Sequence, residues 1–383
     1  MTHTAHLTHG LAGDELPPDW PPLAEAEVAS LLERIPAAGM LKAIAWRSPR
    51  PLSAAALVDV EGGRFFIKRH HASVRTAKTL AEEHRFATHL RTQGLPVPAL
   101  HADINGATAI AMGDWTFEVH TPARGRDIYR DAYSWSPVGS VAQARTAGAM
   151  LARVHLASRG YEAPQRSTHI LVARADLLEA NDPVCALEAQ LGERPALARF
   201  LATRDWRDEL RATMAPWHAA ACDAVAAQPR LWTHGDWHVS NLCWSGEGDD
   251  ATITDVLDMG LSASTFALFD VATAIERNAI AWLEIERGDI GRDDLAVAML
   301  AGYHSVSPFT SADLAALAAV LPLVHVDFAL SEVEYFEGVT GRRDHAGVAW
   351  HTFLHGHAAW FASAPGQRLL DAIRDAGRDF VLQ

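Results

Sequence analysis

The sequence predicts an α+β protein of two lobes: a small N-terminal lobe built on an antiparallel sheet and a larger C-terminal lobe that is mainly helical. A chain of 383 residues is too long for one simple hydrophobic core. Short apolar segments joined by turns are concentrated before residue 120, whereas helical patterns dominate after residue 270. We therefore expect a flexible N-terminal extension, a small lobe and a large lobe over residues 1–22, 23–116 and 117–383.

The first elements belong to the small lobe. Residues 1–22 contain His3, His6, His9 and two Pro-Pro pairs, and this composition is more typical of a loose polar tail than of a metal site. The apolar spacing that follows predicts a short helix over residues 24–33. Three strands are expected next, the last two joined by a Glu-Gly-Gly hairpin turn, over residues 43–46, 55–60 and 64–68.

The remaining elements follow in order. A helix is expected over residues 76–93, and it ends at the Gly-Leu-Pro-Val-Pro turn of residues 94–98. Further strand segments are expected over residues 99–104, 107–112 and 115–120. In the large lobe we expect helices over residues 140–158, 199–227, 271–286, 295–303, 311–321, 323–336, 351–361 and 368–380.

Composition limits the classes of partner. The content of hydrophobic residues, 49%, and of charged residues, 21%, is that of a soluble globular protein. A formal net charge of -14 disfavours nucleic acid and anionic membranes as partners and favours small cationic ones. The apolar run over residues 314–324 contains a proline and is too short to span a bilayer. The three cysteines are far apart, and the N-terminus lacks a signal-peptide pattern, so we expect a cytoplasmic protein.

One stretch carries a chemical pattern. Residues 233–241, Thr-His-Gly-Asp-Trp-His-Val-Ser-Asn, connect two short apolar runs and predict a loop between strands. Asp236 and Asn241 have the spacing of a kinase catalytic loop, in which the Asp accepts the proton of the attacking hydroxyl and the Asn holds magnesium. A further strand over residues 251–257 leads to Asp258, which we expect to be the second metal ligand.

These residues resemble the aminoglycoside phosphotransferase and choline kinase-like family, which has a protein-kinase-like fold. The shared features are a His-Gly-Asp-x-His-x-x-Asn loop at residues 234–241, the Asp on the next hairpin, and Phe-Asp-Val-Ala at residues 269–272. Several elements in order and at compatible spacing make this signal specific. The first hairpin, residues 46–53, departs from protein kinases because it has no glycine to bring backbone N–H groups to phosphates.

The resemblance implies an ATP site with Mg²⁺. Lys68 ends a Phe-Phe-Ile-Lys strand and would contact the phosphates of ATP, held there by Glu83, with Glu82 as the reserve. Adenine would bind to the hinge backbone, where Glu118 and His120 contribute N–H and C=O groups.

For the metal, the resemblance implies Asn241 and Asp258 as ligands and Asp236 as the catalytic base. Asp255 competes with Asp258, and the twelve-residue interval from Asp258 to Asp270 favours Asp258. Asp270 starts a helix and is expected to be structural, capping that helix or bracing the catalytic loop.

We favour structural roles for three further residues, two in the loop and one in an earlier helix. We expect His234 to brace the loop by hydrogen bonds and Gly235 to occupy a place where a side chain does not fit. His155, near the end of the helix over residues 140–158, is expected to be a buried, hydrogen-bonded core residue. The less favoured alternative is a transition-metal site made by His234, Asp236 and His238.

The function favoured by these residues is an ATP- and Mg-dependent phosphotransferase that moves the γ-phosphoryl group of ATP to a hydroxyl of a small metabolite or antibiotic. A Ser/Thr protein kinase of the stress-response branch stays open, because residues 82–86 contain its Glu-Glu-His-x-Phe string. A His/Asp metal-dependent hydrolase would leave Lys68, Glu83 and Asp258 without a role. A non-catalytic nucleotide-binding regulator would require the loss of a catalytic position, and none of the expected positions is lost.

The acceptor is the least determined part. By resemblance, the C-terminal helices build its pocket, where Asp327 and Glu334 share a helical face near Glu332 and Tyr335. Such a face suits an ammonium group, although a solvated acidic face is the explanation we favour. His351, His355 and His357 have metal-like spacing, but their aromatic and apolar neighbours favour core packing. The sequence leaves open the acceptor itself, ATP or GTP as the donor, and the oligomeric state.

Overall fold

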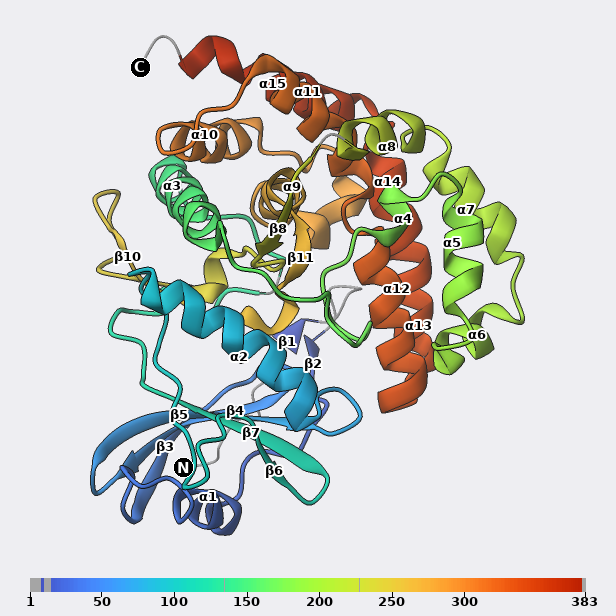
Figure 1. Ribbon diagram of the computed structural model, residues 1–383. Helices are drawn as coiled ribbons and strands as arrows, with labels where there is room; N and C mark the ends of the chain where they lie inside the picture. Colours follow the sequence, from blue (N-terminus) through green and yellow to red (C-terminus); the bar gives the residue numbers. More distant parts are fainter. Residues whose placement is uncertain (1–7, 10–14, 134, 227, 381–383) are drawn as a thin grey trace.

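The computed structural model describes residues 8–9, 15–133, 135–226 and 228–380, and it confirms the predicted fold class (Figure 1). The small lobe is built on a five-stranded antiparallel sheet, and helices form most of the remainder. In sheet order the strands are β3 (Leu41–Arg47), β4 (Ala54–Val60), β5 (Gly63–His71), β7 (Trp115–His120) and β6 (Ile110–Met112).

A separate hydrophobic core supports the small lobe. Strand β4 alternates, so that Ala54, Ala56, Val58 and Val60 are buried together with Ile67 of β5. Helix α1 (Glu25–Leu32) adds its apolar stripe to this core. Helix α2 (Ala77–Thr92) lies between the sheet and the helical lobe (Figure 1), so it can transmit the position of one lobe to the other.

Helices build the large lobe. They are α3 (Val141–Ser158), α4 (Asp176–Glu179), α5 (Pro183–Gln190), α6 (Pro195–Leu201), α7 (Trp206–Met214), α8 (His218–Ala226), α9 (Ala267–Asn278), α10 (Asp293–His304), α11 (Ser311–Val320), α12 (Val326–Tyr335), α13 (Arg343–Val348), α14 (His357–Trp360) and α15 (Ala364–Phe380). The helix expected over residues 199–227 is three helices. One break has a clear cause, because Pro216 offers no N–H for a helical hydrogen bond.

The most apolar helical run crosses the core of the large lobe. Residues Ser311–Thr340 are long and apolar enough to span a membrane by length and composition, but 83% of their most apolar window is buried inside the protein. This run is longer than the segment considered from the sequence, because Pro322 lies in the first turn of a helical segment, where no N–H is needed. Burial of this kind is what a core helix requires.

Residues 17–22 differ from the expected flexible extension. Trp20 stacks on His71 of β5 with ring centroids 4.9 Å apart, and the Pro21 carbonyl accepts a hydrogen bond from Arg69 at 2.5 Å. The Asp19 carboxylate accepts a hydrogen bond from Tyr335 of α12 at 3.0 Å. The expectation is therefore wrong for this segment, because its side chains find partners on both lobes. His3 and His6 lie outside the described residues.

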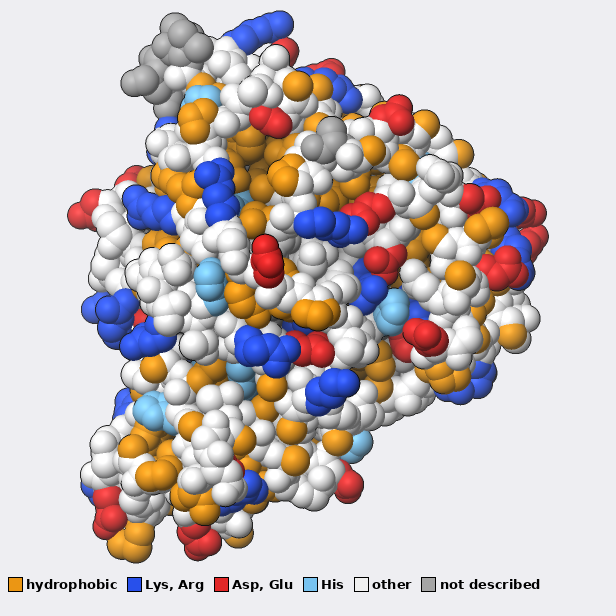
Figure 2. Space-filling model, viewed as in Figure 1, with side chains coloured by type: hydrophobic (Ala, Val, Ile, Leu, Met, Phe, Trp, Pro, Cys, Tyr) orange, Lys and Arg blue, Asp and Glu red, His pale blue; other side chains and the backbone are white. Residues whose placement is uncertain are grey.

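Charge is mixed over the surface. On the face drawn in Figure 2, the side chains of Lys and Arg are interspersed with those of Asp and Glu over both lobes.

Candidate active site

Two short ribbons hold the loop of residues 234–241. Strand β8 (Arg230–Thr233) pairs with β11 (Ala263–Phe266), and β9 (Leu242–Trp244) pairs with β10 (Ile253–Val256). The chain therefore enters the loop from one ribbon and leaves it into the other. This confirms the expected strand–loop–strand arrangement.

Asp270 of α9 braces the start of the loop. Its carboxylate accepts the backbone N–H groups of His234 and Gly235, each at 2.8 Å, and its Oδ2 lies 3.0 Å from His155 Nε2. Burial raises the pKa of Asp270, but the hydrogen bond and charge of His155 outweigh it, so the net pKa is lowered and the carboxylate stays ionised. His155 also contacts the Tyr303 hydroxyl at 2.9 Å, as expected of a core residue.

Gly235 is the residue that the turn requires. Its φ of +76° lies in the left-handed region, and a Cβ there would come within 2.6 Å of the Ala173 side chain and 2.7 Å of the Leu261 carbonyl. His234 is fully buried, and its Nε2 lies 2.9 Å from the Leu257 carbonyl. Both residues therefore have the structural roles expected from the sequence.

Asn241 and Asp236 face one another. The Asn241 amide nitrogen donates to the backbone oxygen of Asp236 at 2.9 Å and to its Oδ2 at 3.0 Å. Both partners are acceptors, so they determine which end of the amide is the nitrogen. The Asn241 Oδ1 atom therefore points away from Asp236, where it can serve a metal ion.

Asp258 stands where β10 gives way to the short 3₁₀ helix η2 (Met259–Leu261). It has a φ of +56°, and its Oδ1 accepts from Gly260 N–H at 3.2 Å and from Lys68 Nζ at 2.9 Å. Burial alone would raise the pKa of Asp258, but Lys68 lowers it, so Asp258 is a carboxylate. Its rival, Asp255, instead accepts the backbone N–H groups of Arg124 and Gly125.

The expected pairing of Lys68 with Glu83 is wrong. Lys68 pairs with Asp258, while Glu83 Oε2 lies 3.0 Å from Arg166 Nη2 and 3.7 Å from Arg75 Nε. Burial lowers the pKa of Lys68, but the nearby negative charges outweigh it and the net pKa is raised. The sequence interpretation considered only Lys68 as the partner of Glu83 and missed two buried arginines.

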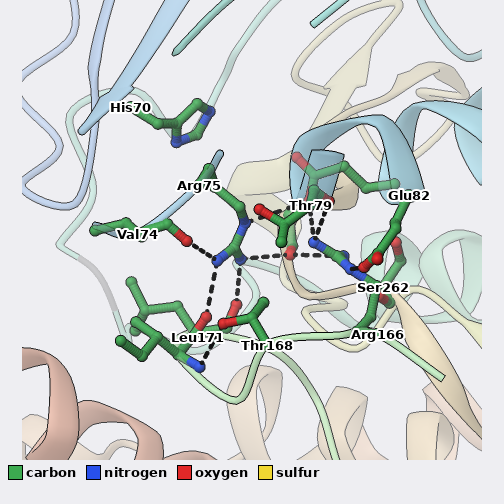
Figure 3. Close-up of polar contacts among 12 residues, drawn as sticks. His70, Val74, Arg75, Thr79, Glu82, Arg166, Thr168, Leu171 and Ser262 are labelled. Atoms are coloured by element: carbon green, nitrogen blue, oxygen red, sulfur yellow. Dashed lines mark hydrogen bonds and ion pairs between the residues drawn. The ribbon is translucent and has the colours of Figure 1, made fainter. Parts of the chain in front are cut away.

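These arginines bind several segments together. Arg75 donates to the carbonyls of Leu171 at 2.6 Å and Gly260 at 2.9 Å, and Arg166 donates to the carbonyl of Ser262 at 2.9 Å. In Figure 3 both guanidinium groups lie between α2 and the segments that carry Leu171 and Ser262. Burial lowers the pKa of Arg75 to about 10. The arginines thus link α2 to the segment that follows Asp258.

The backbone of Glu118 and His120 lies inside the sheet. These residues pair with Lys68 and Phe66 of β5 on one side, and Leu100 bridges to His120 on the other. The expectation that they offer hinge backbone groups to adenine is therefore not met, because neighbouring strands flank that backbone on both sides.

The Glu118 side chain is buried among three histidines. Its carboxylate lies 3.0 Å from His70, 2.8 Å from His84 and 2.9 Å from His120. Burial raises its pKa, but these histidines outweigh that effect and hold the pKa well below its usual range. Among the described residues, His70, Glu83 and Glu118 come close enough to hold an ion. The two buried arginines on Glu83 and the charge of Lys68 disfavour a cation there.

The ring nitrogens of His234 and His238 are already in use. His238 contacts Ser240 Oγ at 2.7 Å and the Ser136 carbonyl at 3.0 Å, and burial lowers its pKa to about 4. His234 accepts the Asp236 N–H through Nδ1. A transition-metal site at these histidines would have to break those contacts, so the hydrolase alternative gains no support.

Four expected residues meet at one cavity of about 250 Å³. Lys68, Asp236, Asn241 and Asp258 all line it, and its walls come from both lobes. Residues 50–53 of the glycine-free hairpin also line it, as do Pro17 and Asp19 of the N-terminal segment. Its lining also includes Glu332, which the sequence interpretation named near the acceptor pocket. Four further large side chains of the lining were not expected there: Trp135, Arg277, Phe328 and Phe336.

The acidic side chains of α12 are buried, contrary to the expected solvated face. Asp327 accepts the Leu177 N–H at 3.1 Å, and Glu334 pairs with Arg194 at 2.7 Å. Glu332 faces the cavity, and its Oε2 has no hydrogen-bond partner among the described residues. Burial raises the pKa of Glu332 to about 8. All ten residues of this helix are buried, which its local sequence pattern did not reveal.

Arg277 of α9 was also missed. Its Nη1 lies 2.7 Å from Asp236 Oδ1, and its guanidinium carbon lies 5.0 Å from the ring centres of both Trp135 and Phe328. The available signal was its spacing, because a residue seven positions after Asp270 lies on the same face of a helix.

For the later histidines, the expected core packing is confirmed for His357, whose ring stacks on Trp282 with ring centroids 3.5 Å apart.

The chain is similar to known phosphotransferases in sequence pattern and in fold. Residues 52–309 match the model of the phosphotransferase enzyme family. A comparison with curated proteins finds no match. Among solved structures, an aminoglycoside phosphotransferase from Alicyclobacillus acidocaldarius is similar, with 14% identity, 94% of this chain and 98% of that chain covered, and a TM-score of 0.53.

Two kinases are similar in the same way. The microcompartment-associated aminopropanol kinase has 16% identity, a TM-score of 0.53, and coverage of 90% of this chain and 99% of its own. An amicoumacin kinase in complex with AMP-PNP and Ca²⁺ has 15% identity, a TM-score of 0.51, and coverage of 92% and 94%. At such identities the likeness is one of fold.

Proposed function

The chain belongs to the phosphotransferase enzyme family, and from this membership we propose that it transfers the γ-phosphoryl group of ATP to a hydroxyl group of a small molecule. The observation that carries the proposal is the meeting of Lys68, Asp236, Asn241 and Asp258 at one cavity. A cation, a carboxylate base and two oxygen donors are the parts that phosphoryl transfer needs. The structures named above as kinases support the choice of ATP as the donor.

The donor set fits Mg²⁺. Asn241 and Asp258 would hold the ion, because Asn241 directs its oxygen away from Asp236 and Asp258 is ionised. When bound, the ion would neutralise charge on the phosphates of ATP. Lys68 now pairs with Asp258, so it stands close enough to exchange that partner for a phosphate oxygen.

Asp236 is the proposed base. It would orient the acceptor hydroxyl and take its proton as the oxygen attacks the γ-phosphorus. Asn241 holds one of its carboxylate oxygens, and Arg277 approaches the other. A positioned carboxylate of this kind is worth about 10²- to 10⁴-fold in rate.

We propose an amine-bearing acceptor. The cavity lining combines the aromatic rings of Trp135, Phe328 and Phe336 with Glu332, whose buried Oε2 has no hydrogen-bond partner among the described residues. The aromatic faces attract an ammonium group, and the charge of that group would favour the ionised form of the Glu332 carboxyl group beside it. The family match and the small-molecule kinases among the similar structures favour a small molecule over a protein chain, and this is the reason to rank a protein kinase second. The free cysteines and the use of ATP favour a cytoplasmic location.

Thermal unfolding of the wild type and Asp258→Ala tests the nucleotide site. Mg·ATP at about a hundredfold over its dissociation constant should raise the free energy of unfolding of the wild type by roughly 2.7 kcal/mol, with little effect on Asp258→Ala. A screen of small amino alcohols for ADP release would then test the acceptor class. The proposal fails if saturating Mg·ATP leaves the wild type unchanged.

A further inference from the structure

Arg277 approaches the proposed base without a hydrogen bond. Its Nη1 lies 2.7 Å from Asp236 Oδ1, and the two side chains are only 13% and 19% exposed. Yet Asp236 Oδ1 and Arg277 Nε have no hydrogen-bond partner among the described residues. The ion pair is therefore close but poorly aligned, and both groups keep the capacity to bond a ligand in the cavity that they line.

The fold fixes Arg277 relative to the loop of residues 234–241. The neighbouring Asn278 donates to the Trp237 carbonyl at 2.7 Å and accepts the Val239 N–H at 3.0 Å. On the same helix, seven residues before Arg277, Asp270 accepts the backbone N–H groups of the first two residues of the loop. Helix α9 thus binds the loop through Asp270 and through Asn278, and Arg277 lies between these two residues along the helix. These hydrogen bonds between the helix and the loop therefore fix the backbone position of Arg277 beside Asp236.

Three other cations of the described chain line the cavity. Lys68 pairs with Asp258, and Arg75 donates to backbone carbonyls and lies near Glu83. Burial lowers the pKa of Arg50, and the charges of Asp127 and Asp236 act against this effect. The Arg277 guanidinium lies 2.7 Å from Asp236 Oδ1, so it stands where the acceptor hydroxyl would meet the phosphoryl group. A phosphoryl group in transfer carries negative charge on its equatorial oxygens, and a guanidinium stabilises that charge.

We propose that Arg277 is a further catalytic residue that binds the phosphoryl group in transfer; this rests on the proposed function. As the bond from the acceptor oxygen to the γ-phosphorus forms, the bond from that phosphorus to the β–γ bridging oxygen breaks. The electron pair leaves with ADP, and the acceptor proton passes to Asp236. The Arg277 guanidinium shifts from Asp236 Oδ1 to the equatorial oxygens, which frees Oδ1 for that proton.

The test uses the planar phosphoryl analogue AlF₄⁻ and needs no acceptor. Dissociation constants of Mg·ADP and Mg·ADP·AlF₄⁻ are measured by calorimetry for the wild type, Arg277→Met, Arg277→Lys and Arg287→Met. The wild type should bind the AlF₄⁻ complex at least about tenfold tighter than Mg·ADP, as a transition-state mimic does. Arg277→Met should lose this preference and keep its affinity for Mg·ADP. Arg277→Lys should retain part of the preference, since it keeps the charge.

Controls separate the alternatives. Arg287 is exposed and has no part in the proposed site, so Arg287→Met should show the same preference for the AlF₄⁻ complex as the wild type. Asp236→Asn should keep the AlF₄⁻ preference; an equal loss in Asp236→Asn and Arg277→Met would make Arg277 a positioning residue for Asp236 and overturn the proposal. An unchanged preference in Arg277→Met, or no preference in the wild type, would also overturn it. A wild type that binds no Mg·ADP would instead refute the proposed function itself.

Discussion

At the scale of single residues, role follows from the nearest partner. Glu83 was expected to pair with Lys68, but it lies close to two buried arginines instead, and Lys68 pairs with Asp258. Asp327 and Glu334 have partners in the core, whereas Glu332 on the same helix lines the cavity, and its Oε2 has no hydrogen-bond partner in the described part of the chain. Acidic side chains of one helix thus differ in role, because two of them have partners within the fold and one lines the cavity.

Asp236→Asn tests the base. The variant keeps the shape of the side chain but cannot take the acceptor proton, so the rate of phosphoryl transfer should fall by about 10²- to 10⁴-fold. Mg·ATP should still stabilise the variant, because Lys68, Asn241 and Asp258 are intact. Steady-state kinetics and thermal unfolding measure the two effects. A near-normal rate would exclude Asp236 as the base.

Glu332→Gln tests the unpartnered carboxyl group. The pKa of Glu332, about 8, lies above its usual value of 4.5, so the folded wild type keeps a proton that the unfolded chain releases. Wild-type stability should therefore fall as the pH rises from about 4.5 to 8, by up to about 1.4 kcal/mol per pH unit. Glu332→Gln does not titrate, so its advantage over the wild type should grow across this window.

The matched control is Glu334→Gln on the same helix. Glu334 has the same burial, 6% exposed, but pairs with Arg194. Its replacement leaves a buried arginine without its charged partner and should destabilise the protein by about 3–5 kcal/mol. Denaturant unfolding at pH 5 and pH 8 compares the three proteins. If Glu332→Gln showed the same pH dependence as the wild type, the carboxyl group would not be the source of that dependence.

At the scale of elements, the contact of α3 with α10 needs glycine on both sides. A Cβ on Gly302 would come within 1.8 Å of the Arg145 carbonyl, and one on Gly148 within 1.9 Å of the Met299 carbonyl. Backbones this close pack well only without side chains between them.

Gly302→Ala should force these helices apart and lower the free energy of unfolding by about 1–3 kcal/mol or more. Gly347 of α13 is the control, because a Cβ there meets nothing within 4 Å. Gly347→Ala should stabilise by about 0.5–1 kcal/mol through helix propensity. Denaturant unfolding measures both variants, and a neutral Gly302→Ala would show that the helices can separate at no cost.

Arg166→Met tests the link between α2 and the segment after Asp258. The change leaves Glu83 with a weaker set of partners and removes the hydrogen bond to the Ser262 carbonyl, so we expect a loss of about 3–5 kcal/mol. Arg126→Met, which removes an exposed pair with Glu247, should cost about 0–1 kcal/mol. Equal losses in thermal unfolding would show that the buried link contributes nothing special.

At the scale of the whole molecule, Asp19 joins the two lobes beside the cavity. Its N–H donates to the Pro51 carbonyl in the small lobe at 3.2 Å, and its carboxylate accepts from Tyr335 in the large lobe at 3.0 Å. Both Asp19 and Pro51 line the cavity. The family match begins at residue 52, so this junction lies outside the matched residues.

Tyr335→Phe removes one side of this junction. The Asp19 side chain, which is only 4% exposed, then loses a hydrogen-bond donor, at a cost of about 1–3 kcal/mol. Amide exchange should become faster at residues 19 and 20 and at residues 50, 52 and 53, where the two lobes meet, and stay unchanged in α3. Hydrogen exchange read by mass spectrometry measures this. Uniform acceleration over the whole chain would indicate a general loss of stability instead.

The resemblance stated from the sequence implied that Lys68, Asp236, Asn241 and Asp258 share one site. The sequence by itself determined the two-lobed α+β fold and the strand–loop–strand setting of residues 234–241. Those features depend on local periodicity and on short spacings along the chain, which a sequence displays directly. The structural roles of Gly235 and Asp270 were predictable for the same reason.

Only the tertiary structure decided which charge meets which. The partners Glu83–Arg166 and Asp236–Arg277 are separated by 83 and 41 positions, and no local pattern relates them. The burial of α12 and the docking of Asp19 likewise depend on which elements surround them. Ion pairs and desolvation act through space over a few ångströms, so they are settled only when folding brings distant segments together.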